Sequence, residues 1–495
     1  MKKNLFRTVV LAASLLVGGL NANAQKGYNV PTLSPEFTAM AQSVVDNQLA
    51  DPDEANKSFG KLLKKISKSK EDLLAAGQFF LDNNNFPAAK QCADKLYNLD
   101  PTYTDGLMFR GEVFMFAKKW GEAGQMFDQV LAIEPTHIAA MKRNAFVYKN
   151  VNPYVAVETL LKIKELQPDY YAADKELGDI RYNMNEYAEA VKHYDLYYPN
   201  TPKEELDIRS CENYLMSLYS VKQFEKITQL VAELEPLAPN DMMIKRMKFF
   251  ASVENARASI NYEADMAKAG EAMNYIANKE FADSSYLYLD YAYAADYKKE
   301  MSDIPAAIEY YNLAISKDST KLNAYTELAK LYRRNKQYDE AIATYKNFMT
   351  LAGDKAKLTD ILGFGQMYMY ASQQEGISPE QKAAYVEAGD AVFQQVLEKE
   401  PTAYQAMLFR ARINIVDGTQ PEEKPKALYE EALKMMEGKE DTDRARIEAC
   451  RYLAFYNVQK DQLDEARKYT DMILSVDPEN SMAKQIDAYL KSQNK

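Results

Sequence analysis

Residue types that often carry enzyme chemistry are scarce in this chain of 495 residues, which has two histidines, one tryptophan and three cysteines. Neither His137 nor His193 stands in an H-x3-H or H-E-x-x-H pattern, so no motif for a metal site or a histidine-dependent triad exists. The cysteines Cys92, Cys211 and Cys450 are odd in number and far apart, with no C-x-x-C. We expect buried thiols without a disulfide, no metal and no cofactor.

Motifs for phosphate binding and covalent catalysis are also missing. The chain has no G-x-S-x-G and no G-x4-G-K-[ST], and no strand leads into a G-x-G-x-x-G turn. Positive charge is in deficit, with 61 Lys and Arg against 72 Asp and Glu, and a surface of this sign repels nucleic acid. The sequence therefore predicts a protein that is not an enzyme and has no nucleic-acid partner.

The one long apolar run lies at the N-terminus. Residues 1–7 are basic, residues 8–20 are apolar over about 13 positions, and Ala22-Asn-Ala24 is a small-x-small site, as in a cleavable signal peptide. The run is shorter than the roughly 20 residues that span a bilayer, and no cysteine near Ala24 could take a lipid anchor. We expect cleavage after Ala24, no membrane insertion, and a periplasmic or secreted protein of a Gram-negative, Bacteroidetes-like bacterium.

What the chain has in abundance is a repeat. Prolines stand 34, 33 and 34 residues apart, at Pro101, Pro135, Pro168 and Pro202. Each closes a segment in which a small residue is followed by a second small residue at twelve positions and usually by an aromatic residue at sixteen. Such a period indicates a repeat array. Its defining positions are Gly77, Ala89, Gly111, Trp120, Ala123, Phe127, Gly178, Ala190, Tyr194, Ala329, Ala341, Tyr345, Ala454 and Ala466.

The residue types at these positions predict two helices per segment. In Tyr325-x2-Leu328-Ala329-x2-Tyr332, apolar residues recur at three and four, on one face of a first helix. A second helix is expected to begin at Tyr338, after a polar turn. Small residues let the two backbones approach, and aromatic residues fill the space around them.

This pattern resembles the tetratricopeptide repeat (TPR), whose 34-residue period and W-x2-L-G-x2-Y…A-x3-F…P signature it matches with Tyr or other residues in the Trp position. The resemblance implies an all-α fold, a right-handed α-solenoid of stacked antiparallel helix pairs, with about nine clear repeats and up to twelve. The N-terminal pattern and the repeat together predict six divisions of the chain. They are a signal peptide at 1–24, a degenerate repeat in 25–69, an array at 70–241, a degenerate helical repeat at 242–287, an array at 288–480 with a loop insertion near 371–382, and a capping helix at 481–495.

In the family, first-helix residues out of phase with the packing face line a concave binding surface. The same phase here selects the candidate binding residues Lys330, Arg333, Arg334, Arg412, Met115, Phe116, Lys142, Phe146 and Tyr182. Cations beside Met and aromatic residues suit an extended peptide with carboxylate groups. The competing interpretation is that each is an ordinary surface residue. The family's carboxylate-clamp pattern is missing, because Phe146 stands where that pattern has Asn.

Two classes of function remain. The first is a non-catalytic protein-binding or peptide-binding scaffold, or an assembly factor, in the bacterial envelope. The alternative is a glycan-capture or nutrient-capture protein of the envelope, similar to outer-membrane glycan-binding proteins that carry TPR segments. The 36 tyrosines favour the alternative, whereas the single tryptophan and the lack of an anchoring cysteine count against it.

Overall fold

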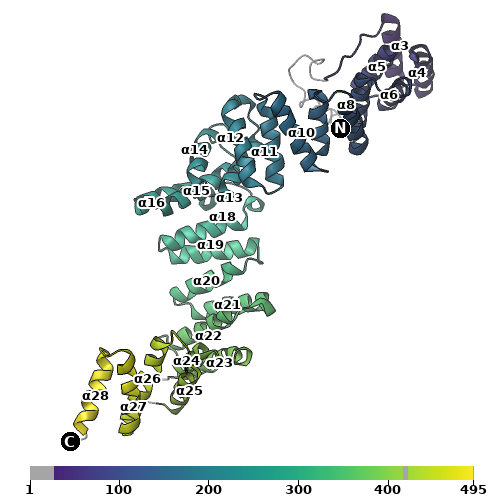
Figure 1. The fold of residues 1–495 in the computed structure, drawn as a ribbon. Helices are drawn as coiled ribbons and strands as arrows, with labels where there is room; N and C mark the ends of the chain where they lie inside the picture. The colour runs from purple at the N-terminus through teal and green to yellow at the C-terminus, as the bar shows by residue number, and fades with distance from the viewer. Residues whose placement is uncertain (1–26, 416–421, 494–495) are drawn as a thin grey trace. The chain divides into compact units, whose positions relative to one another are not determined.

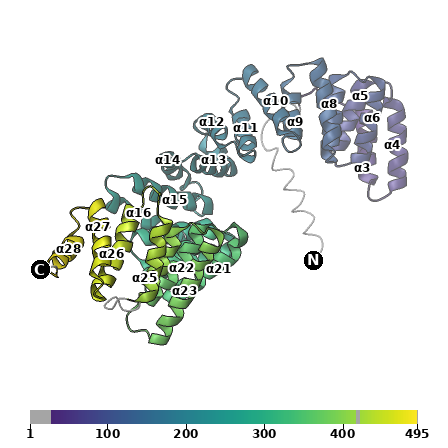
Figure 2. The same ribbon diagram turned by 60° about the horizontal axis from the view of Figure 1, so that its bottom comes forward.

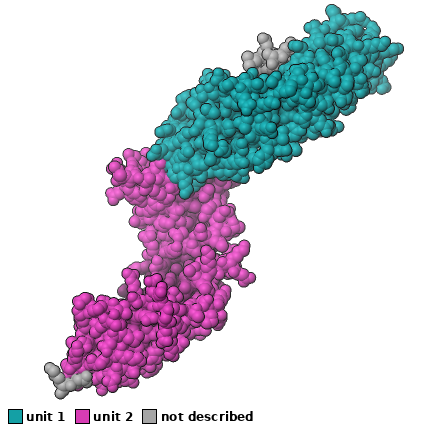
Figure 3. Space-filling view, viewed as in Figure 1, with its two compact units in different colours: residues 1–251 teal, residues 252–495 magenta. Residues whose placement is uncertain are grey.

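The computed structural model describes residues 27–415 and 422–493, and within them the regular structure consists of helices without strands. The predicted signal peptide lies outside the described residues. Two compact units divide the chain, residues 1–251 and residues 252–495, shown in different colours in Figure 3. Among the described helices, none combines the length and the apolar character that a membrane crossing requires. The predicted all-α solenoid is confirmed.

Unit 1 is built from consecutive helices that pack in pairs, α3 with α4, α5 with α6, and so on to α13 with α14. The helices are α3 (Pro35–Asn47), α4 (Pro52–Ile66), α5 (Lys70–Asp82), α6 (Phe86–Leu99), α7 (Thr104–Phe116), α8 (Trp120–Ile133), α9 (Ile138–Tyr148), α10 (Pro153–Leu166), α11 (Tyr171–Asn183), α12 (Tyr187–Tyr197), α13 (Ile208–Ser220) and α14 (Phe224–Leu234). The unit boundary falls inside α15 (Met242–Ala258).

Unit 2 repeats this arrangement, and Figures 1 and 2 show successive pairs stacked along the chain within it. Its helices are α16 (Tyr262–Ala272), α17 (Asn274–Ala277), α18 (Tyr288–Glu300), α19 (Ile304–Lys317), α20 (Leu322–Arg334), α21 (Tyr338–Ala352), α22 (Leu358–Ser372), α23 (Pro379–Lys399), α24 (Tyr404–Ile413), α25 (Glu423–Met435), α26 (Asp443–Gln459), α27 (Leu463–Val476) and α28 (Ser481–Gln493). Short 3-10 turns lie at Tyr198–Asn200, Lys203–Glu205, Asp283–Ser285 and Gly353–Lys355.

Most pairs close through the same tight turn. The Asn85 N–H donates to the Phe80 carbonyl at 2.8 Å, and the Asn84 N–H donates to the Leu81 carbonyl at 3.0 Å, as in a Schellman ending. The backbone has positive φ two residues before the second helix, at Asn84, Lys118, Asn185, Lys222, Ser302, Lys336 and Asp461. The second helix then begins where the spacing predicts, as α21 does at Tyr338.

Close approach within a pair depends on the small positions. A Cβ added at Gly178 would lie 2.6 Å from the ring of Tyr194, sixteen residues on, and one at Gly111 would collide with Phe127. The predicted repeat positions are buried, with one exception. Trp120 begins α8 and is 39% exposed, and its ring makes a T-shaped contact with Phe146.

Two further details differ from or extend the sequence expectations. The polar insertion is shorter than predicted: α22 ends at Ser372 and α23 begins at Pro379, where the Ser378 hydroxyl accepts the Gln381 N–H at 3.1 Å and caps the helix.

The expected buried thiols are confirmed, since all three cysteines are free and buried. Burial raises the pKa of Cys92 to about 12, so this thiol is unreactive.

Candidate functional site

The predicted basic cluster lies at the end of first helix α20. Lys330 Nζ is 2.8 Å from Glu327 Oε1, so its charge is neutralised locally. The guanidinium of Arg333 lies over the ring of Tyr370 in α22, 4.4 Å from the centroid, and Arg334 is exposed. Among the described residues, neither arginine has a carboxylate within ion-pair distance. The cluster therefore presents two available arginines rather than three equal cations.

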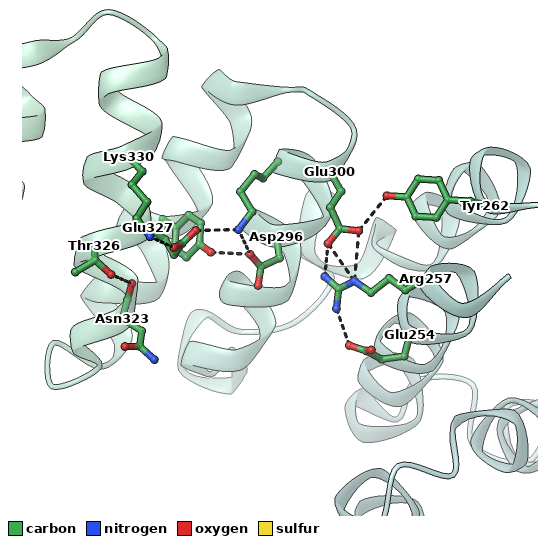
Figure 4. A network of polar contacts seen from close by, with 11 residues as sticks. Glu254, Arg257, Tyr262, Asp296, Glu300, Asn323, Thr326, Glu327 and Lys330 are labelled. Atoms are coloured by element: carbon green, nitrogen blue, oxygen red, sulfur yellow. Dashed lines mark hydrogen bonds and ion pairs between the residues drawn. The ribbon is translucent and has the colours of Figure 1, made fainter. Parts of the chain in front are cut away.

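Lys330 belongs to a charged network that runs along first helices α18 and α20 (Figure 4). Lys299 Nζ lies 2.7 Å from Asp296 Oδ1 and 3.1 Å from Glu327 Oε2, and the Tyr311 hydroxyl donates to Asp296 at 2.7 Å. Burial opposes ionisation of Glu327, but hydrogen bonds from Lys330 and Lys299 hold its pKa below the ordinary value. Alternating charges make this part of the surface electrically balanced.

A second network in Figure 4 joins α15, α16 and α18 within unit 2. Arg257 binds Glu254 at 2.6 Å and Glu300 at 2.5 Å, and the Tyr262 hydroxyl donates to Glu300 at 3.1 Å. Its charges are also paired. Among the described residues near these two networks, Arg333 and Arg334 are the arginines without a carboxylate partner, and Arg333 contacts Tyr370 of α22.

Arg412 in α24 is not free. It binds Glu448 through Nε at 2.6 Å and Nη2 at 2.5 Å, and it lies over the ring of Phe409 at 4.8 Å. The hydrogen bond that Arg412 donates to Glu448 comes first among the causes that raise the pKa of Arg412. Arg333, Tyr370 and Arg412 lie on the consecutive first helices α20, α22 and α24, and we call the surface of these three helices the arginine surface.

The first helices that follow carry two shallow depressions. One, of about 270 Å³, is lined by residues of α24 and α26 that include Phe409, Arg412 and Arg444. The next, of about 240 Å³, is lined by Arg451, Phe455 and Met482 together with Glu448, which both depressions share. The repeat spacing predicted Arg412 as a surface residue of a first helix but did not predict Arg444. Arg444 lies in the first turn of α26, before the positions that the repeat pattern covers.

A larger depression of about 500 Å³ lies beside α23, α24 and α25. Its charged lining residues are Lys382, Glu387, Asp390, Arg410 and Lys424. The Asp390 carboxylate is bound by Arg410 at 2.7 Å and by Lys424 at 3.0 Å. Burial alone would raise the pKa of Asp390, but the hydrogen bonds from Arg410 and Lys424 lower it by more, so the net shift is downward. Asp390 is thus matched by cations within the depression, whereas Arg333 and Arg334 have no carboxylate partner among the described residues.

Two of the candidates in unit 1, Phe116 and Phe146, are exposed aromatic residues. Phe116 is 49% exposed and stacks on Phe86 at 6.0 Å, whereas Phe146 is 46% exposed and meets the edge of Trp120 at 6.1 Å. The Lys149 ammonium lies 4.7 Å from the Phe146 ring. We call Phe116, Trp120 and Phe146 the aromatic row.

The remaining candidates of unit 1 have partners of their own. Lys142 lies over the ring of Tyr170 at 3.7 Å, Tyr182 packs against Tyr187 at 5.8 Å, and Met115 is partly buried against the core. Each of these three side chains therefore has an intramolecular contact, and their assignment as binding residues stays a prediction.

First helices α9, α11 and α13 also line a polar depression of about 390 Å³. Its centre is Asp179, which accepts hydrogen bonds from Tyr194 at 2.8 Å, Asn213 at 3.0 Å and Ser210 at 2.9 Å. Lys175 lies 3.2 Å from the same carboxylate. No group of three or more His, Cys, Asp and Glu that could hold a metal occurs within residues 27–415 and 422–493. We attribute the cluster to joining neighbouring repeats.

Helix pairs of this spacing define the chain as an α-solenoid protein. A family model for the tetratricopeptide repeat matches residues 324–359, which contain most of α20 and all of α21. A TPR repeat-containing protein of Methanocaldococcus jannaschii is 25% identical over 333 residues, 58% of this chain and 58% of that protein. The chain thus spans less than two thirds of that relative's length. These matches support a tetratricopeptide repeat protein, a fold that typically serves as a scaffold.

Solved structures of TPR proteins also match the chain in part. The C-terminal part of a TPR repeat-containing protein from Cytophaga hutchinsonii is 17% identical and covers 63% of this chain and 98% of its own, with a TM-score of 0.38. YrrB, described as a TPR protein with an unusual peptide-binding site, is 15% identical and covers 43% of this chain and 96% of its own, with a TM-score of 0.30. At these TM-scores, neither match carries a functional argument.

Proposed function

We propose that this chain is a non-catalytic scaffold or assembly factor of the bacterial envelope that binds a protein or peptide partner. The observation that supports it most is the state of Arg333, whose guanidinium is stacked on Tyr370 and has no carboxylate within ion-pair distance among the described residues. A carboxylate of a partner would neutralise this charge through a charge-assisted hydrogen bond.

The arginine surface suits an extended segment that carries acidic side chains. Arg333 and Arg334 supply unpaired positive charge, and Tyr370 supplies aromatic surface beside Arg333. Arg412 is already held by Glu448, so we assign it to positioning the surface rather than to direct binding. The proposed partner is therefore an acidic, extended protein segment.

The test is capture of partners from an envelope extract of the bacterium that produces the chain. Arg333→Glu combined with Arg334→Glu should lower the captured amount at least tenfold, and capture by the unchanged chain should weaken as salt is raised. The control is Lys346→Glu with Lys355→Glu, which makes the same change in net charge at exposed cations outside the arginine surface. Equal capture by the two double variants would rule out the arginine surface as the binding site.

The envelope location rests on the predicted signal peptide of residues 1–24, and it has its own test. We expect N-terminal sequencing of the exported protein to begin at Gln25, with the protein in the periplasmic or the culture fraction. An intact Met1 on a protein retained in the cytoplasm would contradict this part of the proposal.

One observation favours glycan capture as a second candidate function. The aromatic row exposes Phe116, Trp120 and Phe146, and such rings form the platforms on which sugars stack. Because Trp120 is the single tryptophan, fluorescence excited at wavelengths that tyrosine does not absorb reports on the surroundings of Trp120 alone. A saturable fluorescence change with an oligosaccharide, lost in Phe146→Ala, would support glycan binding, and a flat titration over a glycan panel would oppose it.

A further inference from the structure

The segment of residues 27–33, which precedes α3, lies on the surface of first helices α5, α7 and α9. Tyr28 is only 6% exposed, and its hydroxyl donates a hydrogen bond to Gln78 Oε1 in α5 at 2.6 Å. The main-chain N–H of Asn29 faces the carboxylate of Asp105 in α7 and favours its ionised form, although burial raises the pKa of Asp105 overall. A buried tyrosine and its hydrogen bond to Gln78 thus anchor an extended segment on a helical surface.

Gly27 brings this segment into close contact with α9. Its φ is +70°, a conformation that favours glycine, and a Cβ added there would collide with the side chain of Ala139. Val30 and Leu33 pack against the same hydrophobic core as Tyr28. The segment and the surface therefore fit each other over several consecutive residues, which chance contact of a chain end would not produce.

The surface does not need the segment in order to form. Helices α5, α7 and α9 are each packed in a pair with α6, α8 and α10, and these pairs stack on one another. Among the described residues, no main-chain to main-chain hydrogen bond joins residues 27–33 to a helix. The contact is that of a peptide on a preformed surface, so the segment can leave while the surface keeps its shape.

The environment of Tyr28 restricts what can take its place. Burial comes first, and the charges of Glu112 and Asp82 come next, among the causes that raise the pKa of the phenol. Asp105 adds to the negative charge, and the nearby cation Arg143 is bound to Glu112. The site therefore accepts a neutral phenol and repels a phosphorylated tyrosine or an acidic neighbour.

We propose that the surface of α5, α7 and α9 binds an extended segment of a partner protein that carries an unmodified tyrosine preceded by glycine. Residues 27–33 occupy this surface as an internal competitor until the partner displaces them. This inference rests on the proposed scaffold function and deepens it by naming the partner chemistry for unit 1. It uses none of the residues of the arginine surface.

The experiment measures binding of a labelled peptide, Gly-Tyr-Asn-Val-Pro-Thr-Leu-Ser, which copies residues 27–34. By fluorescence anisotropy, the full chain with Tyr28→Ala should bind this peptide at least tenfold more tightly than the unchanged chain does. Gly27→Leu, which also displaces the internal segment, should have the same effect. Peptides with alanine or phosphotyrosine in place of the tyrosine should bind at least tenfold more weakly to both variants.

Ala139→Leu provides a matched control, because it fills the space that Gly27 occupies. Added to Tyr28→Ala, it should abolish peptide binding while circular dichroism shows an unchanged helical signal. Equal binding to the unchanged and the variant chains, or no binding to either folded variant, would overturn the proposal. A dimer of the unchanged chain that Tyr28→Ala dissociates would also overturn it, since the occupant would then come from a second copy.

The outcome is separable from that of the proposed arginine surface. Arg333→Glu with Arg334→Glu, introduced into the Tyr28→Ala chain, should leave peptide affinity unchanged. Failure of the peptide to bind would thus leave capture by the arginine surface standing, and the reverse also holds.

Discussion

In unit 1, the surface of α5, α7 and α9 buries a tyrosine from the chain's own N-terminal segment, whereas in unit 2 the arginine surface leaves two guanidinium groups without carboxylate partners. The scaffold beneath the two surfaces is the same. In both units a glycine of a first helix meets an aromatic ring of the second helix, Gly178 with Tyr194 and Gly365 with Phe393. The residues in phase with the core fix the helix pairs, and those out of phase are free to specify different partners.

The largest effect should come from breaking what the two units share. Gly178→Leu and Gly365→Leu each place a side chain against a buried ring, so each should lower the free energy of unfolding by about 3 kcal/mol through overpacking. Because each repeat contacts only its neighbours, hydrogen exchange should increase in the altered repeat and its flanks. Loss of protection along the whole chain after either change would contradict a solenoid of locally coupled repeats.

A glycine with open space around it supplies the control for these variants. Gly121 lies in α8, and a Cβ there would meet nothing within 4 Å. Gly121→Ala should therefore raise the free energy of unfolding by roughly 0.5–1 kcal/mol, since alanine is the better helix former. Chemical denaturation of the three variants side by side measures the contrast.

The next effect separates the units. Tyr28→Ala removes a buried ring from unit 1, so residues 27–33 should lose about 2 kcal/mol of local stability, and their amide exchange should accelerate roughly thirtyfold. Tyr28→Phe keeps the ring and removes one hydrogen bond to Gln78, so we expect about 1 kcal/mol. Exchange rates in unit 2 should stay unchanged in both variants, and a change there would mean that the segment acts beyond unit 1.

A smaller difference between the units is their response to pH. In unit 1, burial together with the charge and hydrogen bond of Asp241 raises the pKa of Glu212 to about 7. Asp241 itself caps α15 by accepting the Ile244 N–H at 2.9 Å. In unit 2, the resolved shifts of carboxyl pKa are downward, as for Glu327 and Asp390.

The direction of the pH effect follows from these shifts. The folded chain holds the Glu212 proton more tightly than the unfolded chain does, so this stabilising contribution is full below about pH 4.3 and is lost as pH rises toward 7. Glu212→Gln should therefore raise the melting temperature at pH 8 relative to the unchanged chain and have little effect at pH 4. Equal effects at both pH values would mean that the Glu212 pKa is not raised.

The residues that face the core were predictable from the sequence because their positions repeat. Gly111, Ala123 and Phe127 recur at fixed offsets, and their burial follows from that period alone. Trp120 shows the limit of this reasoning, because the first residue of a second helix can turn either toward the core or toward a neighbouring helix. Its ring contacts Phe146, which is not part of the repeat signature.

For the surface residues of the first helices, the sequence predicted the positions but not all of the contacts. The sequence places Lys330 and Arg412 on first helices, and the three-residue spacing of Glu327 and Lys330 on one helix allows for their ion pair. It does not show that Glu448 neutralises Arg412, because these side chains belong to different repeats and the spacing does not encode where they meet. Tyr28 escaped prediction for a related reason. It lies outside the period, and the one hint was a Gly-Tyr-Asn sequence close to the predicted cleavage site.

The smallest predicted effect concerns Tyr370, the counterpart of Tyr28 in the arginine surface. No hydrogen bond of its hydroxyl is seen within the described residues, and its ring meets the Arg333 guanidinium at 4.4 Å. Tyr370→Phe should therefore leave the free energy of unfolding nearly unchanged, whereas Tyr370→Leu should lower it by about 0.5–1 kcal/mol through loss of the cation–π contact. Partner capture should follow the same order, intact in the phenylalanine variant and reduced in the leucine variant. A large loss in Tyr370→Phe would instead show that the hydroxyl binds the partner, as the Tyr28 hydroxyl binds Gln78, and the two surfaces would then share one mode of recognition.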